Sequence, residues 1–445
     1  MAIVAPSAYT LGGVQTWLDY LVPGLTDKGW TVHVLLVDGV HSRADEYLRV
    51  HPLPDVIRVA NPTGSREGRI RALSGCIATV DPDIVLVVNI VDAYEAVRRL
   101  RTKSRSGPKI AMALHGLNAC FQQDIQRWHS LLDGVIATNQ LAVQAAIEFG
   151  GMPASRTHYS PCGVEIGPEP EPICPNETLE LVYVGRFDNS EKRVLDLAPV
   201  LAALQRENVP FRLRLAGAGP EEADLRDALA SFGDKVQFLG SLDAETLRKH
   251  LFTPQNIILI LSHSETGPLV AWEAMAGGAV VVTSRFVGIG LEGALYDGRT
   301  CLTFPTGEAE RAAQAISRLR EIRLRISLSS AGRQLAYGRY SRASSIRAWD
   351  EALSSTLVAP DREEVVIPAE NGLLFGRLDK LVGAILAEEV RHLLNIRFEH
   401  AEPGGEWPHS YGLDGSPEFR LALENLDAGD ATPVHPSFDC GGALQ

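Results

Sequence analysis

Short apolar strands alternate with helical segments along most of this chain, and the alternation runs twice. We expect strands at 31–37, 84–89, 109–114, 134–138, 180–185, 211–216, 235–239, 256–261 and 279–283. Helix-period segments lie between them, at Val14–Gly29, 140–149, 193–206 and 220–231. Strands that are apolar without interruption are typical of parallel sheets covered by helices on both faces. The sequence therefore predicts an α/β fold built from doubly wound sheets.

A proline-rich acidic stretch divides the two series. Residues 165–178 read EIGPEPEPICPNET, with four prolines that favour an extended linker. We predict a first domain at 1–165, a linker at 166–178 and a second domain at 179–358. Two doubly wound domains joined in this way enclose a cleft between the carboxyl ends of their strands, where ligands bind.

The remaining residues, 359–445, are predicted to form an acidic C-terminal extension. The chain has 42 basic and 55 acidic residues, a net charge of −13, and most of the excess acid lies in this extension. Within 371–394, apolar residues recur at the spacing of one helix face. They are Leu374, Leu378, Leu381, Ile385 and Val390. We expect this amphipathic helix to pack its apolar face on the body or on a second subunit, which would make the protein a homo-oligomer.

Composition narrows the function classes. An acidic balance is atypical of nucleic-acid-binding proteins, so no nucleic-acid partner is expected. No window approaches the about 18 apolar residues of a membrane-spanning helix, and the start, MAIVAPSAYT, lacks a signal-peptide pattern. We therefore expect a cytoplasmic protein. The basic cluster 98-RRLRTKSRSGPK-109 suggests peripheral contact with anionic lipid at the inner face of the membrane, although a solvated helix end explains it equally well.

The strongest local signal is a pair of glutamates in 262-SHSETGPLVAWEAMAGG-278. Glu265 and Glu273 are separated by seven residues, the first in a loop after a strand and the second inside a helix that begins near Pro268. Backbone N–H groups of such a loop suit anions and hydroxyls, and a carboxylate there can bind sugar or ribose hydroxyls. Two glutamates alone are more often a solvated loop acid and an ordinary helix-face acid.

Three further strand ends carry residues suited to ligand binding. Gly185-Arg186 follows a strand and Lys192 comes six residues later, so two cations are placed to bind a pyrophosphate. Gly12-Gly13 precedes a helix and permits close approach of a phosphate. His115 follows the strand 109–114, where active-site residues gather. Each motif alone is weak, because surface charge, a tight turn or a structural histidine explains it as well.

In order and spacing, these segments resemble the retaining family 4 glycosyltransferases of the GT-B fold (glycosyl transferases group 1). The resemblance covers about 1–355 and includes DGVIATNQLAVQAA at 133–146, SPCGVE at 160–165, LRLAGAGPE at 213–221 and DGRTCLTFPTGE at 297–308. It implies two Rossmann-like domains facing a cleft, the acceptor on the first and a nucleotide sugar on the second. The segment 340–353 resembles the family's closing helix, which returns to the first domain.

The resemblance also implies a role for each motif. Arg186 and Lys192 would bind the diphosphate of the donor, and Glu273 would bind its ribose. Glu265 would bind the transferred sugar, together with the backbone of Thr266, Gly267 and Leu269. His115 would contact the sugar from the first domain, which makes it and Glu265 the catalytic candidates, and Gly12 and Gly13 would line the phosphate side. Pro268 departs from the common family pattern and removes one N–H donor.

The expected activity is a metal-independent, retaining hexosyltransferase without a cofactor, acting on a nucleoside-diphosphate sugar and a glycan or lipid-linked acceptor. Asp81-Pro82-Asp83 has the acid-x-acid pattern of metal-dependent transferases, but it precedes a strand, where a turn explains it. Two alternatives stay open: a catalytically silent GT-B binding or scaffold protein, and a related nucleotide-sugar enzyme such as an epimerase. Incubation with labelled donors, with and without acceptor, separates the three.

Overall fold

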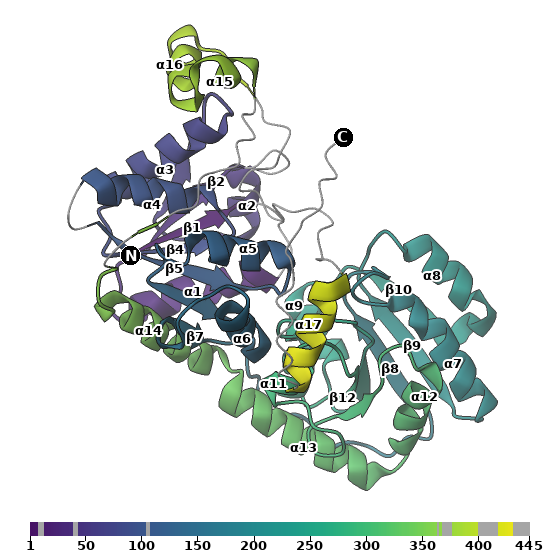
Figure 1. Cartoon of the computed structure of the whole chain (residues 1–445). Helices are drawn as coiled ribbons and strands as arrows, with labels where there is room; N and C mark the ends of the chain where they lie inside the picture. Colours follow the sequence, from purple (N-terminus) through teal and green to yellow (C-terminus); the bar gives the residue numbers. More distant parts are fainter. Residues whose placement is uncertain are drawn as a thin grey trace.

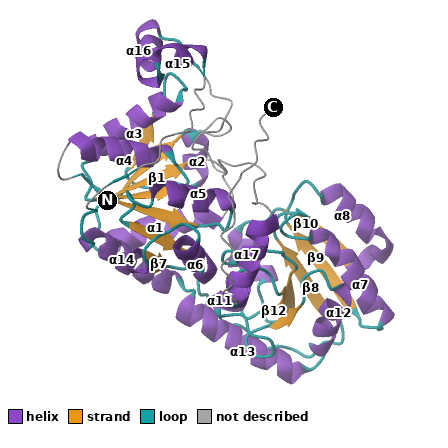
Figure 2. Cartoon of the chain, in the orientation of Figure 1, coloured by secondary structure: helices purple, strands orange, loops and turns teal. Residues whose placement is uncertain are grey.

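Two parallel sheets stand side by side, each with helices on both faces (Figures 1 and 2). The computed structural model describes residues 1–7, 13–38, 43–103, 107–362, 365–366, 376–398 and 417–429. This arrangement confirms the predicted α/β fold with two doubly wound domains.

The first sheet has the strand order β3-β2-β1-β4-β5-β6-β7. Its strands are β1 (Ala2–Pro6), β2 (His33–Val37), β3 (Val56–Val59), β4 (Ile84–Val88), β5 (Lys109–Leu114), β6 (Gly134–Ala137) and β7 (Thr157–Tyr159). They are connected by α1 (Gly13–Asp27), α2 (Ala44–Val50), α3 (Arg66–Val80), α4 (Asp92–Lys103), α5 (Ala119–Trp128) and α6 (Gln140–Glu148). The strands pair in parallel, and β1 pairs with both β2 and β4, so the crossover direction reverses at β1.

Alternate side chains of each strand enter two different cores, which explains why the strands read as continuous apolar runs. In β1, Ala2 and Val4 pack with the layer that holds α3 to α6, whereas Ile3 and Ala5 pack with Trp17 and its neighbours on α1. Burial on both faces is the requirement that a parallel sheet places on its sequence.

The second sheet repeats this order with six strands, β10-β9-β8-β11-β12-β13. The strands are β8 (Leu179–Val184), β9 (Phe211–Ala216), β10 (Val236–Gly240), β11 (Asn256–Ile260), β12 (Val280–Ser284) and β13 (Leu302–Phe304). Its helices are α7 (Leu197–Arg206), α8 (Glu222–Leu229), α9 (Ala244–Thr246), α10 (Leu269–Ala276), α11 (Ile289–Glu292), α12 (Ala309–Arg318) and α13 (Ile322–Arg339). Here the crossover direction reverses at β8, so ligands are expected beyond the carboxyl ends of β8 and β11.

The chain crosses between the two domains at two adjacent points. Val164 N donates to Tyr340 O at 2.7 Å, and Arg342 N donates to Val164 O at 2.9 Å. Beyond this crossing, α14 (Arg342–Val358) packs against α1 and β5, where Trp349 is fully buried. Although α14 falls within the range 179–358 that was predicted as the second domain, it packs as part of the first domain.

The extension places a helical hairpin on α3, and its packing corrects the expected one. The sequence pattern predicts one helix that buries an apolar face, but Gly383, at a φ of +81°, divides the segment into α15 (Arg377–Val382) and α16 (Ala384–Leu394). Leu374 lies outside the described residues. Leu381 and Ile385, two residues of the predicted apolar face, are 80% and 58% exposed.

Polar contacts hold this hairpin instead. Glu388 is buried and accepts hydrogen bonds from Thr63 Oγ1, at 2.6 Å, and from Ser65 Oγ. On the same side, Arg391 pairs with Asp379 at 2.5 Å, with both side chains almost completely buried. Burying charged groups requires satisfied partners. The contacts of Glu388 with Thr63 and Ser65 place the polar face of α16 against the body, and the Arg391–Asp379 pair joins α16 to α15.

The final described helix, α17 (Pro417–Ala428), lies between the two domains (yellow in Figure 1). Phe419 and Leu423 enter the core of the first domain, where the Phe419 ring meets that of Phe149 edge-on. Asp427, at the other end of α17, accepts hydrogen bonds from the backbone at the start of α11 in the second domain. The extension is therefore attached to both domains.

The basic cluster 98–109 is largely paired with carboxylates of the first domain and, at Lys109, of the extension. Its ion pairs are Arg98 with Glu95, Arg99 with Glu67, Arg101 with Asp133, and Lys109 with Asp361. Residues 104–106 lie outside the part of the chain that the structure describes. Among the described cations of the cluster, these four already have structural partners, which reduces the charge available to a lipid surface.

Candidate active site

Arg186 stands directly after β8, at the edge of the sheet where ligands are expected. Its guanidinium lies 3.3 Å from a carboxylate oxygen of Asp188 and 3.2 Å from one of Glu191, and the side chain is 56% exposed. Partial burial raises the pKa of Asp188, but hydrogen bonds from Glu191 N and Ser190 outweigh this effect, so the pKa is lowered overall. Arg186 is therefore accessible, with two ionic partners in its own loop that a ligand anion must replace or join.

Lys192 and Glu265 form the central ion pair of the site. Lys192 Nζ lies 2.6 Å from Glu265 Oε1, and Ser262 Oγ donates to the same oxygen at 2.6 Å. Both charged side chains are mostly covered, at 28% and 12% exposure. The predicted diphosphate cation and the predicted sugar-binding carboxylate thus meet directly, and Ser262, which the sequence interpretation missed, fixes the carboxylate.

The loop after Glu265 bridges the two domains. Thr266 Oγ1 donates to His115 O at 2.8 Å, and Thr138 Oγ1 donates to Thr266 O at 3.3 Å. Gly267 has a φ of +120°, a conformation that side chains rarely adopt, so glycine is needed at this position. These contacts bring predicted residues of the second domain against the strand ends β5 and β6 of the first.

The imidazole of His115 is packed between aromatic rings. It meets Trp17 edge-on at 4.6 Å and stacks with Trp349 at 6.2 Å, while Nδ1 lies 3.9 Å from Cys162 Sγ. Within the described residues, its buried Nε2 has no hydrogen-bond partner. Burial lowers the pKa of His115 to about 4, so the ring is neutral at physiological pH. A neutral ring with one unpaired nitrogen can exchange a hydrogen bond with a ligand hydroxyl but carries no charge to it.

Glu273 lies in a different part of the cleft from Glu265. It is on α10 and lines a small pocket of about 30 Å³ whose walls come from both domains. Residues of this pocket are Thr16, Trp17, Tyr20, Cys162, Gly163, Val164, Glu165, Ala244, Arg248, Leu269, Glu273 and Arg342. The predicted residue Leu269 is therefore beside Glu273, and Tyr20, Arg248 and Arg342 are neighbours that no sequence motif indicated.

The environment of Glu273 favours its protonated form. Burial raises the pKa of Glu273 to about 7, and the charges of Arg248 and Arg342 oppose that shift without cancelling it. Both arginines are also held by Glu165, with Arg342 Nη1 at 3.3 Å from its carboxylate. A carboxylate that titrates near neutrality inside an interdomain cleft is a common feature of functional sites.

The glycine-rich turn contributes less to the described site. Gly13 begins α1, and Gly12 lies outside the described residues. The part of α1 that does face the cleft holds Thr16, Trp17 and Tyr20, where Gly163 N donates to Tyr20 Oη at 2.5 Å. The placement of phosphate near Gly12-Gly13 stays a prediction.

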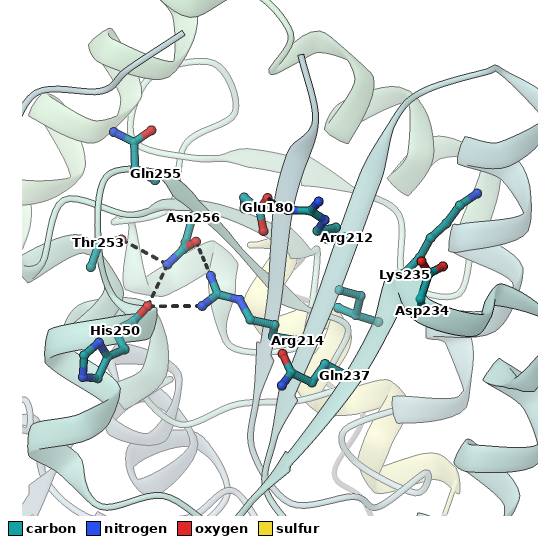
Figure 3. Close-up of a pocket in the computed structure, with 11 residues that line it drawn as sticks. Glu180, Arg212, Arg214, Asp234, Lys235, Gln237, His250, Thr253, Gln255 and Asn256 are labelled. Carbon is teal, nitrogen blue, oxygen red and sulfur yellow. Dashed lines mark hydrogen bonds and ion pairs between the residues drawn. The ribbon is translucent and has the colours of Figure 1, made fainter. Parts of the chain in front are cut away.

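A larger polar pocket, of about 400 Å³, lies on the amino-terminal halves of strands in the second sheet (Figure 3). Arg214 of β9 donates to Asn256 Oδ1 at 2.6 Å, and Arg212 lies 3.6 Å from a carboxylate oxygen of Glu180. None of the predicted site residues lines this pocket. The candidate site is the interdomain cleft at the opposite ends of the strands, although the free space there is smaller.

The described residues contain no group of three or more His, Cys, Asp or Glu side chains placed to hold a metal ion. Asp81, from the acid-x-acid motif, ends α3 in a left-handed conformation. None of the helices in these parts of the chain is long and apolar enough to cross a membrane.

Comparison with known proteins identifies the class. The model for "Glycosyltransferase Family 4" matches residues 11–167, and that for "Glycosyl transferases group 1" matches residues 178–321, so together they account for more than half of the chain. The chain belongs to the family 4 glycosyltransferases, and its two-domain architecture is the GT-B fold.

Individual relatives are distant. Phosphatidyl-myo-inositol mannosyltransferase of Mycolicibacterium smegmatis is 25% identical over 71% of this chain and 83% of its own length. A glycogen synthase of Mycobacterium tuberculosis is 33% identical, but the match covers 31% of this chain and only one third (33%) of that enzyme.

Solved structures share the fold at low identity. Anabaena HepE, solved in complex with UDP and glucose, has a TM-score of 0.63 and 18% identity, covering 80% of this chain and 100% of that one. Sucrose-phosphate synthase of Thermosynechococcus elongatus has a TM-score of 0.65 and 19% identity, covering 81% and 99%. At these identities the likeness establishes the fold alone.

Proposed function

We propose that this glycosyltransferase moves a hexose from a nucleoside-diphosphate sugar to an acceptor hydroxyl and retains the anomeric configuration. The observation that carries the proposal is the contact between Lys192 and Glu265 at 2.6 Å, with exposed Arg186 on the same rim. A diphosphate and a sugar are joined by one bond, so a site for both needs a cation and a hydroxyl-binding carboxylate at adjacent positions.

In the proposed reaction, the bond between the anomeric carbon and the phosphate oxygen breaks, and its electron pair stays on that oxygen. A bond from the acceptor oxygen forms on the same face of the sugar. The acceptor proton passes to the departing phosphate oxygen, so no protein base is needed. Lys192 and Arg186 offset the negative charge that grows on the leaving diphosphate, which is the principal contribution of the protein to catalysis.

Donor binding then requires an exchange of ionic partners. Without ligand, Lys192 is held by Glu265, and Arg186 by Asp188 and Glu191. The diphosphate takes over contacts to both cations, and Glu265 is freed to accept hydrogen bonds from the sugar. Each cation keeps an anionic partner throughout, which avoids the cost of an unpaired charge in a partly buried site.

The remaining donor contacts follow from the cleft. Glu273 accepts hydrogen bonds from the ribose hydroxyls, with Leu269 beside it in the same pocket. His115 contributes its unpaired ring nitrogen to a sugar hydroxyl from the first domain. The backbone of Thr266 and Gly267 and the turn at Gly12-Gly13 complete the donor site, with no cofactor and no metal ion required.

The acceptor is a glycan or lipid-linked glycan in this proposal. The relative named for mannosyl transfer to phosphatidyl-myo-inositol supports a lipid-linked hydroxyl, and the glycogen synthase supports a glucan. A cytoplasmic protein that meets lipid-linked acceptors would touch the membrane only peripherally. Salt-sensitive sedimentation with anionic vesicles tests that contact, and the absence of such sedimentation contradicts it.

The proposal is tested first by ligand-induced stabilisation. A ligand that binds only the folded state raises the melting temperature, so UDP, GDP and ADP are compared at equal concentration. One of them is expected to stabilise the wild type and to lose most of this effect with Lys192→Ala. Stabilisation by none of the three contradicts a nucleoside-diphosphate site. Labelled sugar donors of the best nucleotide, with and without acceptor, then separate transfer from epimerisation and from silent binding.

A further inference from the structure

The C-terminal helix α17 connects the first domain to the loop that carries Glu265. Its N-terminal half is anchored by Phe419, 1% exposed, and by Leu423, both in the core of the first domain. Its C-terminal end reaches the second domain through Asp427. Figure 1 shows this helix lying across the space between the two sheets.

Asp427 holds the start of α11 with both carboxylate oxygens. Oδ2 accepts hydrogen bonds from Gly288 N at 2.8 Å and Gly290 N at 3.1 Å, and Oδ1 accepts one from Leu291 N at 2.9 Å. Hydrogen bonds from N–H groups to a carboxylate are stronger than those between neutral groups. One side chain from the extension therefore fixes three backbone N–H groups within the four residues 288–291 of the second domain.

The backbone that Asp427 fixes is bonded to the Glu265 loop. Glu265 N donates to Val287 O at 3.1 Å, and Val287 N donates to His263 O at 2.9 Å. Gly288 packs so closely on this loop that an added Cβ would lie 2.3 Å from Glu265 O. A shift of Gly288 is thus transmitted to Glu265 by direct contact.

The same segment also faces the first domain. Asn139 Nδ2 donates to Gly288 O at 3.2 Å. Gly290 has no room for a side chain, because an added Cβ would lie 2.3 Å from Asp427 O. The loop 286–291 is therefore held between α17, the first domain and the Glu265 loop, and α17 is the element that the sequence interpretation left without a role.

We propose that Asp427 is a positioning residue for Glu265, and that α17 makes the C-terminal extension a working part of the transferase site. Asp427 does not touch the substrate in this proposal. It sets the orientation of residues 287–288. Through the hydrogen bond from Glu265 N to Val287 O, it also sets the position of the Glu265 carboxylate, which binds the transferred sugar. This inference rests on the proposed function for the role of Glu265, but the placement of the loop is testable without it.

The test compares Asp427→Ala and Asp427→Asn with the wild-type full chain. Leu421→Ala, at an exposed position of the same helix, is the matched control. Amide hydrogen exchange in peptides over 262–267 and 286–292 is measured first. The Ala variant is expected to lose protection in both peptides, the Asn variant to be intermediate because it keeps one acceptor oxygen, and the control to match the wild type.

Kinetics form the second readout. With the sugar donor of the nucleotide that best stabilises the protein, Asp427→Ala is expected to lower kcat about tenfold, as a small misplacement of a substrate-binding group does. The affinity for the free nucleoside diphosphate is expected to change less than twofold, since Arg186, Lys192 and Glu273 are intact. A merely structural role would instead lower the folded fraction and both quantities together.

Three results overturn the inference. They are unchanged protection over 262–267 in Asp427→Ala, an unchanged kcat, and a higher kcat, which would mean that Asp427 occupies a place the donor needs. Phe419→Ala, which removes the anchor but keeps Asp427, should reproduce the kinetic effect if the folded fraction is preserved. If the wild type transfers no sugar at all, the proposed function fails, while the exchange measurement still decides whether Asp427 positions the loop.

Discussion

Replacing Glu273 by Gln should abolish a pH dependence of nucleotide binding. This dependence arises from the ionisation of Glu273 inside the cleft. Glu273 is expected to accept hydrogen bonds from ribose hydroxyls, and the carboxylate is a stronger acceptor than the protonated acid. Burial holds its pKa at about 7, against an ordinary value of 4.5. Glu273 must therefore lose a proton before its carboxylate can bind the ribose hydroxyls. Nucleotide binding should tighten as the pH rises.

The magnitude follows from the ionised fraction. With a pKa of about 7, roughly one tenth of the groups are ionised at pH 6 and nine tenths at pH 8, so the apparent affinity should rise about tenfold. The phosphate of the nucleotide also titrates in this range. Dividing the wild-type Kd ratio by that of Glu273→Gln, measured by calorimetry at both pH values, removes that contribution.

Stability offers an independent check with a fixed sign. Because the pKa of Glu273 is raised in the folded state, the native protein binds more protons than the unfolded chain between about pH 4.5 and pH 7. This group's contribution to the free energy of unfolding must fall as the pH rises through that window, and Glu273→Gln should remove the fall. A corrected Kd ratio below twofold, or equal pH profiles of stability in the two proteins, refutes the assignment of a neutral-range pKa to Glu273.

Three further predictions concern the rim of the site. Arg186→Ala and Lys192→Ala should each lower turnover at least tenfold while the protein stays folded, measured by steady-state assay and calorimetry, and near wild-type turnover in both would contradict diphosphate contact. Glu265→Gln should lower sugar transfer strongly while the Kd for the free nucleoside diphosphate stays within about threefold; the reverse pattern would exchange the roles of the two glutamates. Activity should survive EDTA, because Lys192 and Arg186 supply the charge, and loss with EDTA followed by rescue with Mg²⁺ or Mn²⁺ would overturn this.

The sequence predicted the strands well because a parallel sheet imposes a strict requirement on them. All nine expected strands are present with ends shifted by two residues or fewer, as in 211–216, which is β9, and 279–283, which is β12 at Val280–Ser284. β1, a central strand of five buried residues, was given no bounds, and β3, β7 and β13 were missed. The last three have three or four residues and lie at sheet edges, where few apolar contacts are needed to hold them.

The site was predictable only in part. Lys192 and Glu265 could be named from the glycine-cation and Glu-x7-Glu motifs, but their direct pairing depends on the adjacent ends of β8 and β11, which the chain order does not reveal. Ser262 and Arg342 carry no motif of their own. They reach the site through the register of a strand end and through the crossing of the chain between domains.

The packing of the C-terminal extension differs most from the predicted packing. The leucine spacing in 371–394 favoured an apolar contact. Instead, hydrogen bonds from Thr63 and Ser65 to buried Glu388, and the ion pair of Glu389 with Arg71 of α3, place the polar face on the body. A periodic pattern identifies which residues share a face but not which face is buried when charged partners are available on the neighbouring helix. The contact of Asp427 with the backbone of 288–291 could not be predicted from the sequence either, because its three hydrogen-bond donors lie about 140 residues earlier in the chain.

The most direct test of the central claim is the stereochemistry of a single transfer. Sugar donors labelled with ¹³C at the anomeric carbon, carrying UDP, GDP or ADP, are incubated with the protein and with glucan or lipid-linked acceptors, and the product is followed by NMR. We predict release of one nucleoside diphosphate and a new glycosidic bond with the anomeric configuration of the donor. A product with the inverted configuration, or an epimerised donor without transfer, would contradict the account.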